Sequence, residues 1–249
     1  MILKEKNKIK FFQFPNLSDF KSINHGVIIR YYSDNPFKNM NLSFTASDDL
    51  DAVTNNRNLL LNMTNFDNIV YLKQVHSDKI IIIDKKINHE SEQEGDAIIS
   101  NIQKQGISIK TADCQSIIIY DPTKKVVANI HSGWRGSINN IAGKTVNKME
   151  KYFSSKPSEL FVGISPSLGP CCAEFKNYKD EIPSEFWEYK NDFNYFDFWK
   201  ITTAQLCEEG LKEANIYSSN ICTKCNQHLF FSYRGEKKTG RFATFIGLN

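Results

Sequence analysis

A cysteine and two histidines stand where strand-like runs of the sequence end. His76 follows IVYLKQV, Cys114 follows ISIKTAD, and His131 follows VVANI. Runs rich in β-branched residues and bounded by turn residues are typical of buried strands, so each side chain should be presented by rigid backbone. One thiolate and two imidazoles can form a three-ligand zinc site with an open position for water. The sequence therefore predicts a metal site at strand ends.

Such a site would be catalytic. Zinc held by three protein ligands lowers the pKa of a bound water to about 7 and makes a hydroxide nucleophile at neutral pH. Asp113, beside Cys114, is placed to orient a ligand or to carry a proton. Without metal, Cys114 and one histidine could instead be the nucleophile and base of a Cys-His hydrolase. Residue spacing does not separate these two alternatives.

The segment HSGWRG predicts an anion site next to His131. Residues 137–153 repeat apolar side chains at three- and four-residue steps, which indicates a helix, and Ser137 is a suitable N-cap. Arg135 then lies just before the helix start, where backbone N–H groups and the helix dipole favour phosphate or another anion. The alternative is a tight turn with a surface arginine.

The other cysteines predict less. CTKCNQH places Cys222, Cys225 and His228 at a spacing that suits a zinc knuckle, but no second ligand pair is evident. We interpret this segment as core packing or chance proximity. Cys171 and Cys172 are adjacent, and adjacent cysteines rarely form a relaxed disulfide or bind one ion together. One of them could face the site from its loop.

The elements that position these residues are those of an α+β domain. We predict a helix over about 50–63, with Asp48 and Asp49 as caps. We predict a hairpin from IVYLKQVH and KIIIID, with His76 at its tip or at a bulge, and a second hairpin around RGEKKTG. With no internal repeat or clear linker, we expect one domain over residues 1–249, a mixed or antiparallel sheet packed by helices.

Composition and charge argue against a protein that binds nucleic acid or spans a membrane. A chain of 249 residues can bury one sizeable core, and its net charge of +3 gives no electrostatic case for nucleic acid or an anionic membrane. No apolar run approaches the roughly 20 residues that span a bilayer, and MILKEKNKIKFFQF lacks the core of a signal peptide. The six cysteines then suit a reducing compartment. We expect a cytoplasmic protein.

Several segments, from about Asn41 to the C-terminus, resemble one enzyme family. In chain order they are LKQVHSDKI, GDAIISN, KTADCQSIIIYDP, ANIHSGWRGSINNI, GISPSLGPCC and CTKCNQHLFFSYRGEKKTGR. This pattern is similar to that of the family once called multicopper polyphenol oxidoreductases, or laccase-domain proteins. Its members are now described as purine nucleoside phosphorylases with adenosine deaminase activity.

The resemblance implies a monomeric zinc enzyme that acts on purine nucleosides and phosphate. The implied reactions are phosphorolysis of adenosine, inosine, guanosine and methylthioadenosine, and hydrolytic deamination of adenosine. Its implied site residues are the zinc ligands His76, Cys114 and His131, the phosphate or substrate residues Arg57 and Arg135, and the pocket residues Asn41, Gln74 and Asp113.

We rank a Cys-His hydrolase second and a copper-dependent polyphenol oxidoreductase third. A multicopper centre needs more ligands than five histidines readily supply. His25 and His89 also lie in segments that do not suggest metal binding.

Overall fold

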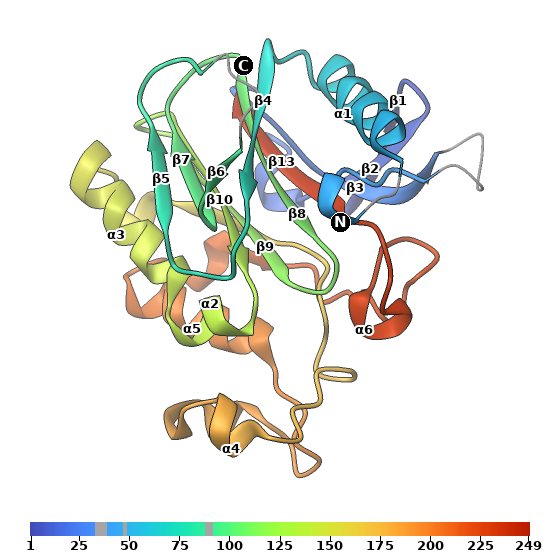
Figure 1. Cartoon of the computed structure of the whole chain (residues 1–249). Coiled ribbons are helices and arrows are strands. Elements are labelled where there is room, and N and C mark those ends of the chain that lie inside the picture. Colours follow the sequence, from blue (N-terminus) through green and yellow to red (C-terminus); the bar gives the residue numbers. More distant parts are fainter. Residues whose placement is uncertain (33–38, 47–48, 88–91) are drawn as a thin grey trace.

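The computed structural model describes the chain except for residues 33–38, 47–48 and 88–91 (Figure 1). The predicted α+β class is confirmed, but the strands form two mixed β-sheets that pack against each other instead of one sheet. The seven-stranded sheet is formed, in spatial order, by β1 (Ile2–Lys6), β2 (Ile9–Gln13), β3 (Ile23–Tyr32), β13 (Phe242–Leu248), β8 (Gln105–Thr111), β4 (Asn68–Lys73) and β6 (Gln93–Glu94). The six-stranded sheet is formed by β12 (Ile216–Ser218), β11 (Phe161–Ile164), β9 (Gln115–Asp121), β10 (Val126–Ser132), β7 (Ala97–Ser100) and β5 (Ile80–Ile83).

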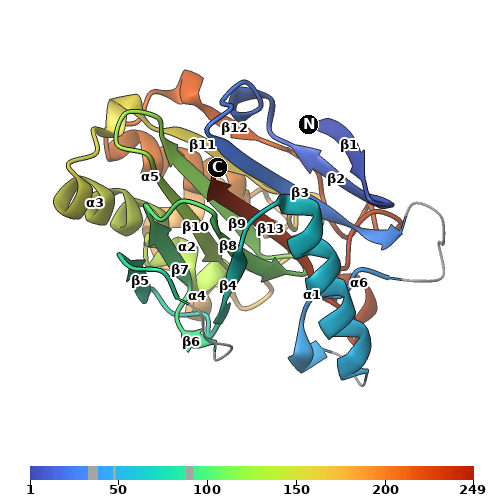
Figure 2. The same cartoon turned by 90° about the horizontal axis from the view of Figure 1, so that it is seen from above.

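Helices cover the outer faces of both sheets (Figures 1 and 2). The α-helices are α1 (Leu50–Thr64), α2 (Trp134–Ile138), α3 (Ile141–Phe153), α4 (Tyr178–Glu181), α5 (Phe198–Glu208) and α6 (Tyr233–Glu236). Helix α1 packs on the seven-stranded sheet through Leu60 and Met63, whereas α3 and α5 pack on the six-stranded sheet. In the described residues, no helix is both long and apolar enough to cross a membrane.

The strands at the centre of the molecule are buried on both faces. In β9, Ile118 and Tyr120 join the core between the two sheets, whereas Ile117 and Ile119 contact the layer formed with α3 and α5. A strand with two buried faces shows a continuous apolar run rather than alternation. This explains why QSIIIYD and VVANI predicted strands, and both predictions are confirmed.

The predicted helix over 50–63 is also confirmed as α1. Asp49 is its N-cap, because its side chain accepts a hydrogen bond from the backbone N–H of Ala52 at 2.9 Å. Asp48, the other predicted cap, and His89 lie outside the described residues.

Both predicted hairpins are wrong. Strands β4 and β5 belong to different sheets, so the segment carrying His76 crosses from one sheet to the other. Near the C-terminus, α6 precedes one strand, β13, which lies inside the seven-stranded sheet between β3 and β8. Short apolar runs do not reveal which sheet receives them, because that choice depends on long-range pairing.

The predicted helix over 137–153 is two helices. Helix α2 begins at Trp134 with Gly133 as its N-cap, and α3 begins after Asn140, whose side chain accepts from the Gly143 N–H at 2.9 Å. The backbone of Asn140 has a φ of +52°, a left-handed conformation that asparagine tolerates better than most residues. Ser137 is therefore inside α2 and is not a cap.

Candidate metal centre

The structure brings His76, Cys114 and His131 together, and we call these three residues the triad. His76 lies on the segment that crosses between the sheets, Cys114 on the short connection from β8 to β9, and His131 near the end of β10. Their ligand atoms all lie within 4.8 Å of one another. Cys114 Sγ is 4.0 Å from His76 Nε2, and the two imidazole ring centroids are 4.8 Å apart.

These donors fit a metal ion of borderline softness. A zinc ion with tetrahedral ligands at about 2.0–2.3 Å requires its nitrogen and sulfur donors to lie about 3.3–3.6 Å apart. The triad needs only a small contraction from its present spacing to meet that requirement. Thiolate and imidazole ligands suit zinc and several other transition metals, so the donor set indicates a metal site without selecting one ion.

Asp96 positions both histidines. His131 Nδ1 donates to Asp96 Oδ1 at 2.8 Å, and the same oxygen accepts from the His76 backbone N–H at 3.0 Å. The second carboxylate oxygen accepts from the N–H and the hydroxyl of Ser77, each at 2.7 Å. A carboxylate that holds Nδ1–H fixes the tautomer whose Nε2 can bind metal. No role was predicted for Asp96 from the sequence, although an acidic residue that opens an apolar strand was a usable signal.

Opposite charges on Cys114 and His131 stabilise each other within the triad. Burial would raise the pKa of Cys114, but the positive charge of His131 and hydrogen bonds from both histidines hold that pKa below its usual value. Burial would lower the pKa of His131, but the negative charge of Cys114 and the hydrogen bond to Asp96 raise it. A thiolate is the form of cysteine that binds metal.

The backbone around the triad adopts conformations that are uncommon for residues with a side chain. His76 has a φ of +60° and Asp113 a φ of +93°. Such conformations persist where the surrounding structure enforces them, and they concentrate at functional sites. A Cβ atom at Gly133 would lie 3.2 Å from Cys114 Sγ and 3.2 Å from His76 Cδ2, so glycine allows the start of α2 to approach the triad.

The triad borders a cavity of about 560 Å³. This volume lies within the range of about 300–1,000 Å³ that is usual for small-molecule sites. The aromatic residues that line it are Phe44, Trp134, Phe175, Phe198 and Tyr233. The cationic residues that line it are Lys73, Lys110, Arg234 and Arg241. The cavity can therefore accept a molecule with both a flat apolar ring and an anionic part.

Three of the predicted pocket residues brace the cavity wall. Gln74 lines the cavity, and its amide pairs with the main chain of Lys110 at 2.7 and 2.9 Å. Asn41 is buried outside the lining, where its Oδ1 accepts from the Arg241 N–H at 2.8 Å. Asp113 lines the cavity, but its carboxylate already accepts hydrogen bonds from three donors in the C-terminal third of the chain.

The two predicted arginines lie outside the cavity lining. Arg57 donates to Glu92 at 2.7 Å and stacks on Phe44, and both of these residues line the cavity. Arg57 therefore supports the cavity wall without lining it. Arg135 is exposed in the first turn of α2, where its guanidinium stacks on Trp134 at 4.2 Å. Arg241, which sequence reasoning did not single out, does line the cavity. Its position depends on the pairing of β13 with β3 and β8, which differs from the predicted hairpin.

Lys110 should make the stability of the protein depend on pH. Its ammonium contacts both carboxylate oxygens of Glu92, at 2.7 and 2.8 Å. Burial lowers the pKa of Lys110 from 10.5 to about 8, although Glu92 opposes this shift. The folded chain then binds fewer protons than the unfolded chain between these two values. Burial of the ammonium therefore destabilises the folded chain fully below pH 8. This destabilisation declines as the pH rises to about 10.5.

We expect the free energy of unfolding to rise by about 2 kcal/mol more in the wild type than in Lys110→Met between about pH 7.5 and 10. Urea denaturation at both pH values measures this difference. The comparison with Lys110→Met removes the contribution of the cysteines and tyrosines that titrate in the same range. Equal changes in the two proteins would contradict the assignment to Lys110.

Comparison with known proteins gives consistent matches over most of the chain. Residues 25–249 match the family described as multi-copper polyphenol oxidoreductase laccase. A protein of Clostridium acetobutylicum named purine nucleoside phosphorylase is 36% identical over 193 residues, which cover 73% of this chain and 78% of that protein. Purine nucleoside phosphorylase YlmD of Geobacillus stearothermophilus is 30% identical and covers 86% of this chain and 85% of its own.

Solved structures share the fold. The structure of YlmD from Geobacillus stearothermophilus has a TM-score of 0.83 at 26% identity, with 99% of this chain and 98% of that chain covered. The hypothetical protein YfiH of Bacillus licheniformis has a TM-score of 0.87 at 22% identity, with 99% of each chain covered. The arrangement of two sheets with outer helices is therefore common to these proteins.

Proposed function

This chain belongs to the multi-copper polyphenol oxidoreductase laccase family, and from that membership we propose that it is a zinc-dependent purine nucleoside phosphorylase that also deaminates adenosine. Its substrates would be phosphate with adenosine, inosine, guanosine or methylthioadenosine. Relatives named purine nucleoside phosphorylase support the reaction class. The observation that carries the proposal is the triad, which borders a cavity with both aromatic and cationic walls.

His76, Cys114 and His131 would hold the zinc ion. When bound, zinc supplies a Lewis acid and lowers the pKa of a coordinated water to about 7. Asp96 holds Nδ1 of His131 and so keeps the tautomer whose Nε2 would bind the ion. Asp113 holds the connection that carries Cys114 against the C-terminal segment, through hydrogen bonds to Thr223 and Ser232. These residues fix the geometry of the donors before substrate enters.

The cavity walls would bind the two substrates. Aromatic rings such as Phe175 and Tyr233 offer surfaces on which a purine can stack. Arg241 is the preferred residue for phosphate, because a guanidinium matches an oxyanion with paired N–H donors. Asn41, Gln74 and Arg57 would support this wall, through the contacts to Arg241, Lys110 and Glu92.

Replacement of Arg241 should impair phosphate binding more than replacement of Arg135. We expect Arg241→Met to raise the KM for phosphate by roughly 10- to 100-fold, the equivalent of a lost charge-assisted hydrogen bond of about 1.5–3 kcal/mol. Arg135→Met should change it less than about twofold, because an exposed arginine on a helix surface contributes little. Initial rates of phosphorolysis at varied phosphate measure both variants.

Deamination of adenosine is the internal control for this comparison, since it consumes water and not phosphate. Its rate should change little in either variant. A large rise in the KM for phosphate in Arg135→Met alone would instead support the role inferred from the HSGWRG segment.

Product analysis with adenosine tests the function as a whole. The protein is purified without chelators, its zinc and copper are quantified, and adenosine is supplied with and without phosphate. Adenine that forms only with phosphate, and inosine that forms without it, would support the two proposed reactions. Zinc at the triad without turnover of any nucleoside would reject the substrate class. Copper with oxidation of polyphenols would support the oxidoreductase alternative.

A metal-free Cys-His hydrolase is the second candidate, because one observation favours it. Cys114, His131 and Asp96 form a chain of thiol, imidazole and carboxylate, the order of groups in a cysteine nucleophile with an oriented base. This candidate predicts ester or amide hydrolysis that survives chelation and is lost when Cys114 is alkylated. The zinc enzyme predicts loss of activity upon chelation and recovery when zinc is restored.

We also propose that residues 1–249 act as one cytoplasmic domain and as a monomer. The two sheets share a single core between them, which supports the domain assignment. Light scattering coupled to size exclusion should give the 28.7 kDa mass of one chain. A dimer mass would contradict the monomer.

A further inference from the structure

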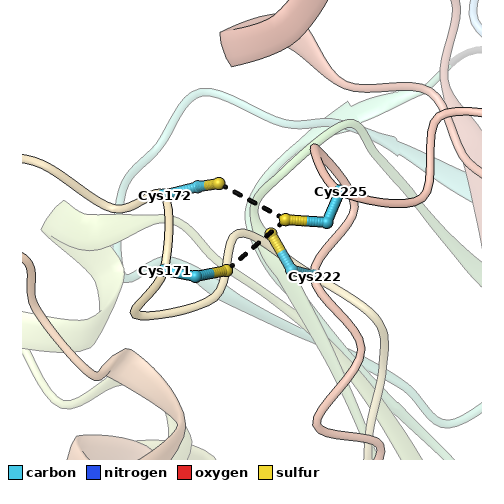
Figure 3. Close-up of side chains that lie close together, drawn as sticks. All are labelled: Cys171, Cys172, Cys222 and Cys225. Atoms are coloured by element: carbon cyan, nitrogen blue, oxygen red, sulfur yellow. Dashed lines mark hydrogen bonds between the residues drawn. The ribbon is translucent and has the colours of Figure 1, made fainter.

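Four cysteines gather at a second place in the molecule, away from the triad. Cys171 and Cys172 lie on the loop after β11, and Cys222 and Cys225 lie on the segment after β12. Figure 3 shows the four sulfur atoms pointing toward one another from these two segments. We propose that this four-cysteine cluster binds a structural zinc ion.

The spacing of the sulfur atoms fits one tetrahedral ion. Cys225 Sγ lies 3.6 Å from Cys171 Sγ and 3.6 Å from Cys172 Sγ, and all four sulfurs lie within 4.8 Å of one another. Zinc–sulfur bonds of about 2.3 Å place tetrahedral sulfurs about 3.8 Å apart. A disulfide would instead require about 2.05 Å between two sulfurs, and all four cysteines are free.

Packing of apolar side chains does not account for this arrangement. Only Cys222 is buried, whereas Cys171 and Cys225 are exposed. Exposed thiols gain little from contact with each other, yet these two point inward to the same centre. The interpretation of CTKCNQH as core packing is therefore wrong for Cys225. The second ligand pair that a zinc knuckle needs is supplied by the adjacent Cys171 and Cys172.

His228, the remaining candidate from this segment, is exposed and does not belong to the cluster.

The cluster joins two segments that both form hydrogen bonds with Asp113, a residue of the cavity lining. Ser167 pairs with Cys222 in a β-bridge, and Leu168 N–H donates to the Asp113 carbonyl at 2.8 Å. From the other segment, Thr223 donates to the Asp113 carboxylate at 2.6 Å. An ion at the cluster would therefore hold together the segments that fix Asp113, and with it the connection carrying Cys114.

The metal content of matched variants tests this proposal. We expect about two zinc ions per chain in the wild type and about one in the double variant Cys171→Ser/Cys225→Ser. Cys207→Ser is the matched control, because Cys207 is the cysteine outside both clusters and should leave the content at about two. Cys114→Ala should remove the other ion only. An unchanged zinc content in the double variant would overturn the proposal.

Stability gives a readout that is independent of activity. Loss of a structural metal should lower the Tm of the double variant by more than about 5 °C, because metal binding contributes directly to folding. The Tm of Cys207→Ser should shift by less than about 2 °C. A double variant with reduced zinc but wild-type Tm would overturn the structural role.

Cobalt substitution of Cys114→Ala tests the cluster with all four of its cysteines intact, so a variant that fails to fold does not prevent the test. Cobalt at four thiolates gives intense thiolate-to-metal charge-transfer absorption, and the triad cannot contribute to it in this variant. Absence of this absorption, or a disulfide among the four cysteines in protein purified under reducing conditions, would overturn the proposal. None of these results depends on nucleoside turnover, so the metal site and the proposed function can fail separately.

Discussion

Replacement of Cys114 by alanine is expected to remove the metal of the triad and to abolish phosphorolysis and deamination together. Residues that only orient a metal ligand already contribute about 10- to 100-fold to metal affinity or activity. Loss of the thiolate ligand itself should therefore lower kcat/KM by more than about 1,000-fold. The fold should persist, because Cys114 lies on a connection and is only partly buried. Zinc content and the rates of both reactions are the measurements.

Cys207→Ala is the control, since this cysteine lies on α5 and outside both the triad and the four-cysteine cluster. Its metal content and rates should match those of the wild type. Retention of nucleoside turnover in Cys114→Ala would reject the triad as the reaction centre. Loss of turnover with full retention of the metal would favour a thiolate nucleophile over a metal ligand.

Asp96→Asn should lower both metal affinity and stability, although Asp96 is not one of the three residues of the triad. The carboxylate is completely buried and bonds His131, the His76 backbone and Ser77. An amide cannot accept at both of its ends, so at least one buried donor loses its partner. We expect metal affinity to fall by about 10- to 100-fold. The Tm should fall by roughly 10 °C, because a broken buried ion pair costs about 3–5 kcal/mol.

Ser77→Ala separates the effect on stability from the effect on metal affinity. It removes one hydrogen bond to Asp96 and leaves the contact between Asp96 and His131 intact. Its Tm should fall by a few degrees, at a cost of about 1.5–3 kcal/mol for a hydrogen bond to a charged group, with metal affinity nearly unchanged. The metal affinity is measured by competition with a chromophoric chelator, and the Tm by calorimetry of the metal-free proteins. Equal metal affinity in Asp96→Asn and the wild type would contradict the positioning role.

Local patterns were sufficient to predict elements whose burial is set by their own residues. The apolar runs of β9 and β10 and the capped helix α1 were predicted because each pattern reports the environment of a contiguous segment. The boundary between α2 and α3 was not predicted, because the apolar spacing continues across it while Asn140 turns into a left-handed conformation. Periodicity reports the buried face of a segment but is insensitive to a single residue that breaks the helix.

The predictions for the site differ in the same way between local patterns and long-range contacts. The amino-acid sequence alone shows that His76, Cys114 and His131 follow strand-like runs, and that their side chains have the chemistry of a metal site. Tertiary contacts, in contrast, place Asp96 against both histidines, bring Arg241 but not Arg135 into the cavity lining, and bring together two cysteine pairs from separate segments. Strand pairing between distant segments sets these contacts, and one segment alone carries no information about its partner.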